Sequence, residues 1–329
     1  MDIDAFLAVR RPTWDRMDQL ARRSRLSGAE TDELIRLYQS AATDLSTVRS
    51  AAPDPDTVTR LSQSLARARA TIAGRHEPAW RDITRFLMIA LPAALYRIRW
   101  WTVAVTVVCV ALAAVSAWWV ATEPGVLDAM MTPEQQQEYV QNAFAEYYQP
   151  GAGFAGVVWT NNAWIAALCI GIGITGVGPA YILLSNALNI GAVAGLMATH
   201  DSLGVFFSLI LPHGMLELTS VFVAGAAGLK LCWAWIVPGG RPRARALAEE
   251  GRALITVAIG LVLALFVSGM IEGFVTGSSL PAWLKILIGA VALAGFWAYT
   301  IVLGRRAVRA GETGDLSEDE AGYTVAVAG

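Results

Sequence analysis

Long apolar runs fill the chain from about residue 100 onward, whereas the residues before them mix polar and apolar positions as soluble helices do. A membrane-spanning helix needs roughly 20 mostly apolar residues. By that measure the pattern predicts an all-α, polytopic membrane helical bundle with about six transmembrane helices. The expected spans are residues 101–121, 163–178, 180–199, 214–237, 254–275 and 282–304.

Two stretches leave the number of crossings open. Residues 203–237 are too long for one crossing at about 1.5 Å per residue, so Pro212 and Gly214 are expected to break them into a short helix, 203–211, and a full span. Residues 163–199 form either two spans or a re-entrant hairpin, and the hairpin would reduce the count to four.

Residues 1–76 predict a cytoplasmic helical domain. Pro12 is placed to begin one helix, and Ser27 with Glu30 has the spacing of a capping box ahead of the next. Asp54 and Pro55 are expected to cap and begin a third helix.

Residues 77–100 combine apolar positions with Arg81, Arg85, Arg97 and Arg99. Arginine and tryptophan favour the headgroup level of a bilayer, so an interfacial amphipathic helix is predicted. The alternative is a packed helix of the N-terminal domain.

Basic residues predict the orientation. The expected outer loop, 122–162, holds no lysine or arginine, whereas residues 239–252 hold four arginines and 304–309 hold three. Because basic loops stay in the cytoplasm, both termini are expected there. The acidic, Gly-rich tail, 305–329, is expected to be disordered.

Composition supports a membrane class. Only 16% of the residues are charged and the mean hydropathy is +0.47, against about 25% charged residues in soluble domains. The basic residues are 23 arginines and two lysines, which suits a high-GC organism and does not indicate a nucleic-acid partner.

The three cysteines lie in apolar runs and predict neither a disulfide nor a zinc site. The N-terminus lacks the apolar core of a signal peptide, so no cleaved signal peptide is expected.

Five polar residues fall within or beside the apolar runs. They are His213, Glu217, Glu272, Asn186 and Asn189. The first two share a helix face at i, i+4, and all are costly in hydrocarbon, so they should face protein or water. A metal site, an ion path and a structural hydrogen-bond network remain open, with the network favoured.

Catalytic patterns are missing from this set. There is no HExxH and no GxSxG motif. The sequence therefore predicts no enzyme, no catalytic residue, no cofactor and no resident metal.

Small residues predict close helix packing. Gly191 and Gly195 have the small-xxx-small spacing, and Gly225 and Gly228 follow on a later span. Such residues let helix backbones approach closely in lipid.

Together these motifs resemble the stage II sporulation protein M family. The similar stretches are the N-terminal "AFLAVRRPTWDRMDQLARR", the entry "RFLMIALPAALYRIRWW", and "GVGPAYILLSNALNIGAVAG" followed by "LPHGMLELTSVFVAGAAGLKL". The resemblance implies a multi-pass protein of the bacterial inner membrane. It also implies possible partners, which are envelope enzymes or a MoxR-type ATPase, with relatives in high-GC actinobacteria.

The leading functional hypothesis is a non-enzymatic scaffold or recruiting component of an envelope complex, embedded in the lipid bilayer and assembled as a homo-oligomer, most simply a dimer. The alternative is a transporter or channel around His213, Glu217 and Glu272. A closed contact at these residues would favour the scaffold, and a wet cavity leading to them would favour transport.

Overall fold

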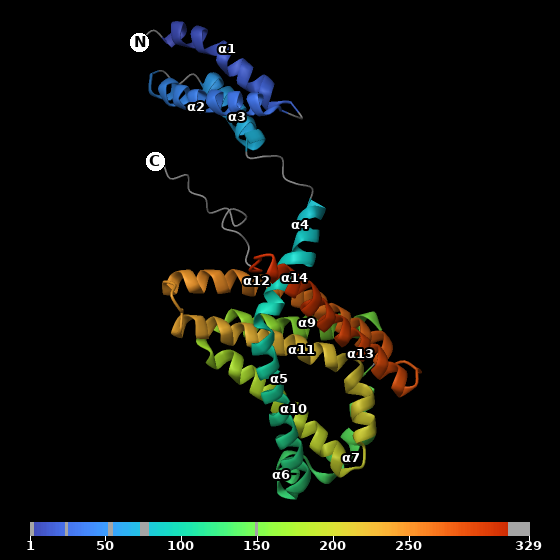
Figure 1. Ribbon diagram of the computed structural model, residues 1–329. Coiled ribbons are helices and arrows are strands. Elements are labelled where there is room, and N and C mark those ends of the chain that lie inside the picture. The colour runs from blue at the N-terminus through green and yellow to red at the C-terminus, as the bar shows by residue number, and fades with distance from the viewer. Residues whose placement is uncertain (1–2, 24–25, 52–54, 73–78, 149–150, 315–329) are drawn as a thin grey trace. The chain divides into compact units, whose positions relative to one another are not determined.

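The computed structural model describes residues 3–23, 26–51, 55–72, 79–148 and 151–314, and all regular elements among them are helices. The chain divides into two compact units, Met1–Asp82 and Ile83–Gly329. The fold class is therefore all-α, as the sequence predicts (Figure 1).

The N-terminal unit contains α1 (Ile3–Ala21), α2 (Gly28–Ala51) and α3 (Pro55–Ile72). Its fully or nearly buried core residues come from all three helices: Met17, Leu20, Leu34, Ala41, Leu61, Leu65 and Ala68. The capping box is confirmed, because the Ser27 amide donates to the Glu30 carboxylate at 2.8 Å and the Glu30 amide donates to the Ser27 hydroxyl at 3.3 Å.

Two helix starts differ in outcome. Pro55 begins α3 as predicted, while its expected cap, Asp54, lies outside the described residues. The expectation for Pro12 is wrong, since α1 begins at Ile3 and continues through Pro12.

Asp18 makes the stability of the N-terminal unit sensitive to acid. Burial alone would raise the pKa of this carboxyl, but hydrogen bonds from Arg22, Arg67 and Ser64 outweigh burial and hold the pKa below its ordinary 3.8. A carboxyl with a lowered folded-state pKa contributes stability above its unfolded-state pKa, and that contribution is lost as the pH falls further.

We expect a fragment of residues 1–82 to lose melting temperature as the pH falls from about 5 to about 2, because the native carboxylates become protonated over this range. Asp18→Asn should flatten this dependence, while Asp15→Asn, at an exposed position, should leave it unchanged. Circular dichroism melts measure both. Identical acid profiles for the parent and Asp18→Asn would contradict the assignment.

Among the described residues, six helical segments are long and apolar enough to cross a membrane. The first is Asp82–Thr122, which ends in α5 (Leu91–Thr122), and the next three are α9 (Ala152–Gly171), α10 (Val177–Thr199) and α11 (Leu203–Ile236). The fifth joins α12 (Arg243–Ile271) to the π-helical turn η4 (Glu272–Thr276). The sixth joins α13 (Ala282–Ala298) to η5 (Tyr299–Leu303) and α14 (Gly304–Arg309). The first segment also includes the end of α4 (Ala79–Arg85) and η1 (Phe86–Ala90).

Three expected boundaries require correction. Residue 100 is not where the first long helix begins, because α5 starts at Leu91 and follows α4 and η1 without a gap. The helix expected at 163–178 begins earlier, at Ala152, so the connecting segment between α5 and α9 is shorter than the expected 122–162. The tail expected from 305 starts with α14, and its residues 315–329 lie outside the described chain.

The break expected at Pro212 is also wrong. α11 is a single helix over Leu203–Ile236 with Pro212 inside it, so 203–211 is no separate element. Figure 1 shows α11 changing direction in its N-terminal part. A proline removes one helical hydrogen bond and kinks the helix, and packed neighbours allow the helix to continue.

Glycines set the closest helix contacts. A Cβ on Gly191 would lie 2.4 Å from the Ala113 carbonyl oxygen and one on Gly195 would lie 2.7 Å from that of Ala117, so α10 packs tightly on α5. On α11, a Cβ on Gly228 would lie 2.5 Å from the Cys169 carbonyl oxygen, and one on Gly225 would meet the Leu183 side chain.

Residues 123–148 form short helices between α5 and α9. They are α6 (Pro124–Met130), α7 (Pro133–Glu138), the π-helical turn η2 (Tyr139–Ala143) and α8 (Phe144–Glu146). Thr132 caps α7 in a capping box with Gln135. Aromatic residues of this segment pack against α11, where the Phe144 and Phe206 rings stack with their centroids 6.0 Å apart.

Candidate functional site

The structure brings together three of the five polar residues that the sequence singles out. His213 and Glu217 come from α11 and Glu272 begins η4, and one ligand atom from each lies within 4.8 Å of the others. His213 is 4% exposed and Glu272 is 3% exposed. We call these three residues the His–Glu cluster.

The ring of His213 is held from one side. Its Nδ1 lies 3.1 Å from the Thr276 hydroxyl, and that hydroxyl has the Ile271 carbonyl as an acceptor at 3.5 Å. This contact fixes the ring plane, so that Nε2 is the ring nitrogen on the side of Glu272. The Ser268 hydroxyl donates to the backbone carbonyl of His213 at 3.0 Å, which fixes the helix at this point.

Neither carboxylate has a Lys or Arg partner among the described residues. Glu272 Oε1 lies 3.8 Å from His213 Nε2, and Glu272 Oε2 is buried with no hydrogen-bond partner. Glu217 lies beside the Asn162 and Ser268 side chains. Within the described chain, no Lys or Arg forms an ion pair with either glutamate. Burying a carboxylate without compensation costs several kcal/mol, so this cluster needs a cation or protons.

A cavity of about 440 Å³ reaches the cluster. Its polar lining includes His213, Glu217, Glu272 and three amides, Asn161, Asn162 and Asn186. Asn186 also donates to the Ile182 carbonyl of its own helix at 2.9 Å. Asn189, expected in the same cluster, instead lines a neighbouring cavity among Tyr139, Phe144 and Phe206.

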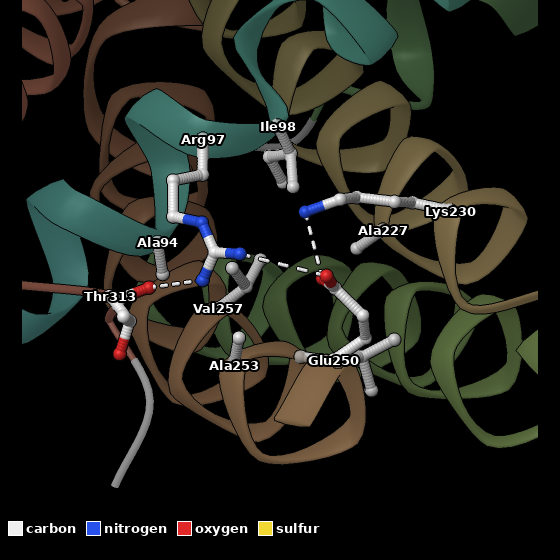
Figure 2. Close-up of a pocket in the computed structure, with 10 residues that line it drawn as sticks. Ala94, Arg97, Ile98, Ala227, Lys230, Glu250, Ala253, Val257 and Thr313 are labelled. Atoms are coloured by element: carbon white, nitrogen blue, oxygen red, sulfur yellow. Dashed lines mark hydrogen bonds and ion pairs between the residues drawn. The ribbon is translucent and has the colours of Figure 1, made fainter. Parts of the chain in front are cut away.

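A second group of charges lies further along α11. Glu250, 7% exposed, accepts from Lys230 Nζ at 2.8 Å and lies within 3.6 Å of Arg97 and 3.7 Å of Arg241. Figure 2 shows Arg97 and Lys230 reaching the Glu250 carboxylate, with Arg97 also donating to the Thr313 carbonyl at 2.6 Å. These contacts join α5, α11, α12 and the segment after α14. We call Glu250 and its three basic partners the Glu250 network.

Apolar packing separates the two charged groups. Glu217 and Lys230 are 13 positions apart on α11, or about 20 Å of helix. The intervening part of the bundle holds buried Val223, Ala224 and Ala227 of α11 packed with Leu261 and Leu265 of α12. Buried apolar side chains therefore lie between the His–Glu cluster and the Glu250 network.

Several functional residues escaped prediction from sequence. Ser268 and Thr276 lie four positions before and after Glu272, a spacing that places all three on one helix face. Asn161 and Asn162 were assigned to the outer loop, although they belong to α9. Glu250 lies in "ALAEEGR", where adjacent glutamates near arginines are typical of a solvated surface.

The chain matches the family model described as Stage II sporulation protein M over residues 105–277, just over half of its length. Residues 4–74 match a domain of unknown function. An uncharacterized protein of Methanocaldococcus jannaschii is 25% identical over 122 residues, covering 36% of this chain and 68% of that protein. No solved structure matches. Residues 105–277 include the whole His–Glu cluster and, from the Glu250 network, Glu250, Lys230 and Arg241 but not Arg97.

Proposed function

The chain belongs to the stage II sporulation protein M family of membrane proteins, and from that premise we propose that it is a cation transporter whose intramembrane site is the His–Glu cluster. The supporting observation is the cavity of about 440 Å³ that ends at His213, Glu217 and Glu272. Ionisable residues inside a membrane bundle commonly mark ion pathways.

The arrangement of open and closed regions fits one state of such a transporter. The cavity reaches the cluster, while buried apolar packing and the Glu250 network occupy the bundle further along α11. Alternating access moves helices around a fixed site. In the second state we expect the ion pairs of Glu250 to separate, which would open the opposite end of the bundle.

Flux through proteoliposomes tests this function. We expect liposomes containing the full-length protein to take up cations faster than empty liposomes, as read by trapped metal-sensitive and pH-sensitive dyes. Glu217→Gln and Glu272→Gln should abolish the difference because each removes a charge from the site, whereas Glu123→Gln, at an exposed position, should not. Equal flux with empty liposomes for every cation tried would refute the transport proposal.

A scaffold or recruiting role is the second candidate. It is favoured by the N-terminal unit, which has its own buried core and matches a separate domain model. We expect affinity capture of the full-length protein from mild detergent to recover envelope enzymes or an ATPase, and a chain lacking residues 1–76 to recover neither. Recovery of the same partners by both chains would remove the N-terminal unit as the docking surface.

Light scattering of the same preparation measures whether the protein is a dimer.

The proposed location is the bacterial inner membrane with both termini in the cytoplasm. Gln137 in α7 and Arg245 in α12 are both exposed, and the basic-residue pattern places them on opposite sides. In intact cells, a membrane-impermeant thiol reagent should label Gln137→Cys and spare Arg245→Cys, in a background without the three native cysteines. The reverse labelling would invert the orientation.

A further inference from the structure

We propose that the His–Glu cluster binds a divalent transition-metal ion, such as Zn²⁺ or Mn²⁺, through His213 Nε2 and one oxygen each of Glu217 and Glu272. This inference rests on the proposed function, because it names the class of cation that the same site carries. The three ligand atoms already lie within 4.8 Å of one another.

The first argument is the unpaired polar surface. Glu272 is 3% exposed, its Oε2 has no hydrogen-bond partner, and it lies at the wall of the cavity. Its other oxygen lies 3.8 Å from His213 Nε2, too far for a hydrogen bond. A cation between Nε2 and the Glu272 carboxylate would accept an electron pair from each and satisfy groups that have no hydrogen bond to one another.

The second argument is the orientation of the histidine. A metal-binding histidine commonly uses its second ring nitrogen for a hydrogen bond that fixes the tautomer and the ring plane. The 3.1 Å contact of Nδ1 with Thr276 does this for His213, and Ser268 holds the backbone carbonyl of the same residue. Bond lengths of about 2.0–2.2 Å to each ligand require the three ligand atoms, now within 4.8 Å of one another, to move closer together when the ion binds.

The third argument concerns charge and ligand type. Two carboxylates and a neutral imidazole match the charge of a divalent ion, and no Lys or Arg of the described chain pairs with either glutamate. Imidazole favours zinc, iron and nickel, while carboxylate also suits manganese. An all-oxygen site would be expected for Mg²⁺ or Ca²⁺. Water and the cavity amides can complete the coordination, since Asn162 and Asn186 line the same space.

Equilibrium binding tests the proposal without requiring flux. The full-length protein in detergent is stripped with a chelator, loaded with Zn²⁺ or Mn²⁺, desalted and assayed by elemental analysis and titration calorimetry. We expect one ion per chain and at least tenfold weaker binding in His213→Asn, Glu217→Gln and Glu272→Gln. His200→Asn and Glu123→Gln remove the same groups elsewhere and should bind as the parent does.

Cobalt substitution gives a second readout on the unaltered protein, in case a cluster variant fails to fold. The visible spectrum of bound Co²⁺ should show nitrogen and oxygen ligands. A thiolate charge-transfer band would place the ion at a cysteine and overturn the proposal. The proposal would also be overturned if every cluster variant that elutes as the parent does bound the ion as tightly as the parent. Binding of Ca²⁺ as tight as that of Zn²⁺, or a parent protein that retains no ion, would overturn it as well. Flux of protons without metal binding would leave the transport function standing and refute only the metal.

Discussion

Replacing Glu250 by alanine is expected to destabilise the membrane unit by about 3–5 kcal/mol, the usual cost of removing one partner from a buried ion pair. Glu250 is the one acidic residue within 4.0 Å of Lys230 among the described residues, and the Lys230 side chain is only 18% exposed. Without Glu250, the ammonium of Lys230 stays in the bundle beside the guanidinium groups of Arg97 and Arg241. Like charges and desolvation then act against the native packing.

Thermal melting of the purified protein in detergent measures this effect, and two matched variants decide its cause. Glu249→Ala removes the neighbouring glutamate, whose side chain is 25% exposed and pairs with the more exposed Arg241 and Arg245, so its cost should be smaller. Lys230→Met combined with Glu250→Ala removes the buried charge on both sides and should recover part of the loss. Equal costs for the two glutamates would contradict a buried charge network.

Most of the fold follows from local sequence properties. Apolar runs of sufficient length predict six candidate spans because backbone groups in hydrocarbon must be satisfied within a helix. The capping box at Ser27 and the start of α3 at Pro55 depend only on neighbouring residues, so the sequence contains all that determines them.

The errors arise where tertiary contacts override local signals. The expected outer loop extended to Asn162, but Asn161 and Asn162 line the cavity at the cluster and belong to α9. Pro212 likewise suggested a break. Packing against neighbouring helices keeps α11 continuous there, and local rules cannot describe that packing.

The site was partly predictable. The i, i+4 spacing of His213 and Glu217 and the position of Glu272 near the same end of an antiparallel helix indicate a shared cluster, and the structure brings them together. The prediction that Asn189 joins this cluster was wrong. Asn186 lines the cavity at the cluster, whereas Asn189, three residues further along α10, lines a neighbouring cavity. The Glu250 network depends on contacts between α5, α11 and α12, which no single stretch of sequence reveals.

Gly289→Ala is the second substitution with a large expected effect. A Cβ at this position of α13 would lie 2.1 Å from the Pro212 carbonyl oxygen and 2.8 Å from its carbonyl carbon. Both are backbone atoms, so relief requires α13 and α11 to separate next to His213. Overpacking of this kind costs about 1–3 kcal/mol, although alanine has the higher helix propensity by about 1 kcal/mol in water.

The same helix provides the control. A Cβ on Gly295 of α13 meets nothing within 4 Å, so Gly295→Ala gains the helix propensity without the collision and should melt at or above the parent temperature. Because Pro212 precedes His213, the movement forced by Gly289→Ala should also weaken cation binding at the cluster, which Gly295→Ala should leave intact. If both variants melt as the parent does and retain the ion, then α13 does not pack on α11 beside Pro212 in the membrane. The contact between Gly289 and the Pro212 backbone would then not hold the helix next to His213.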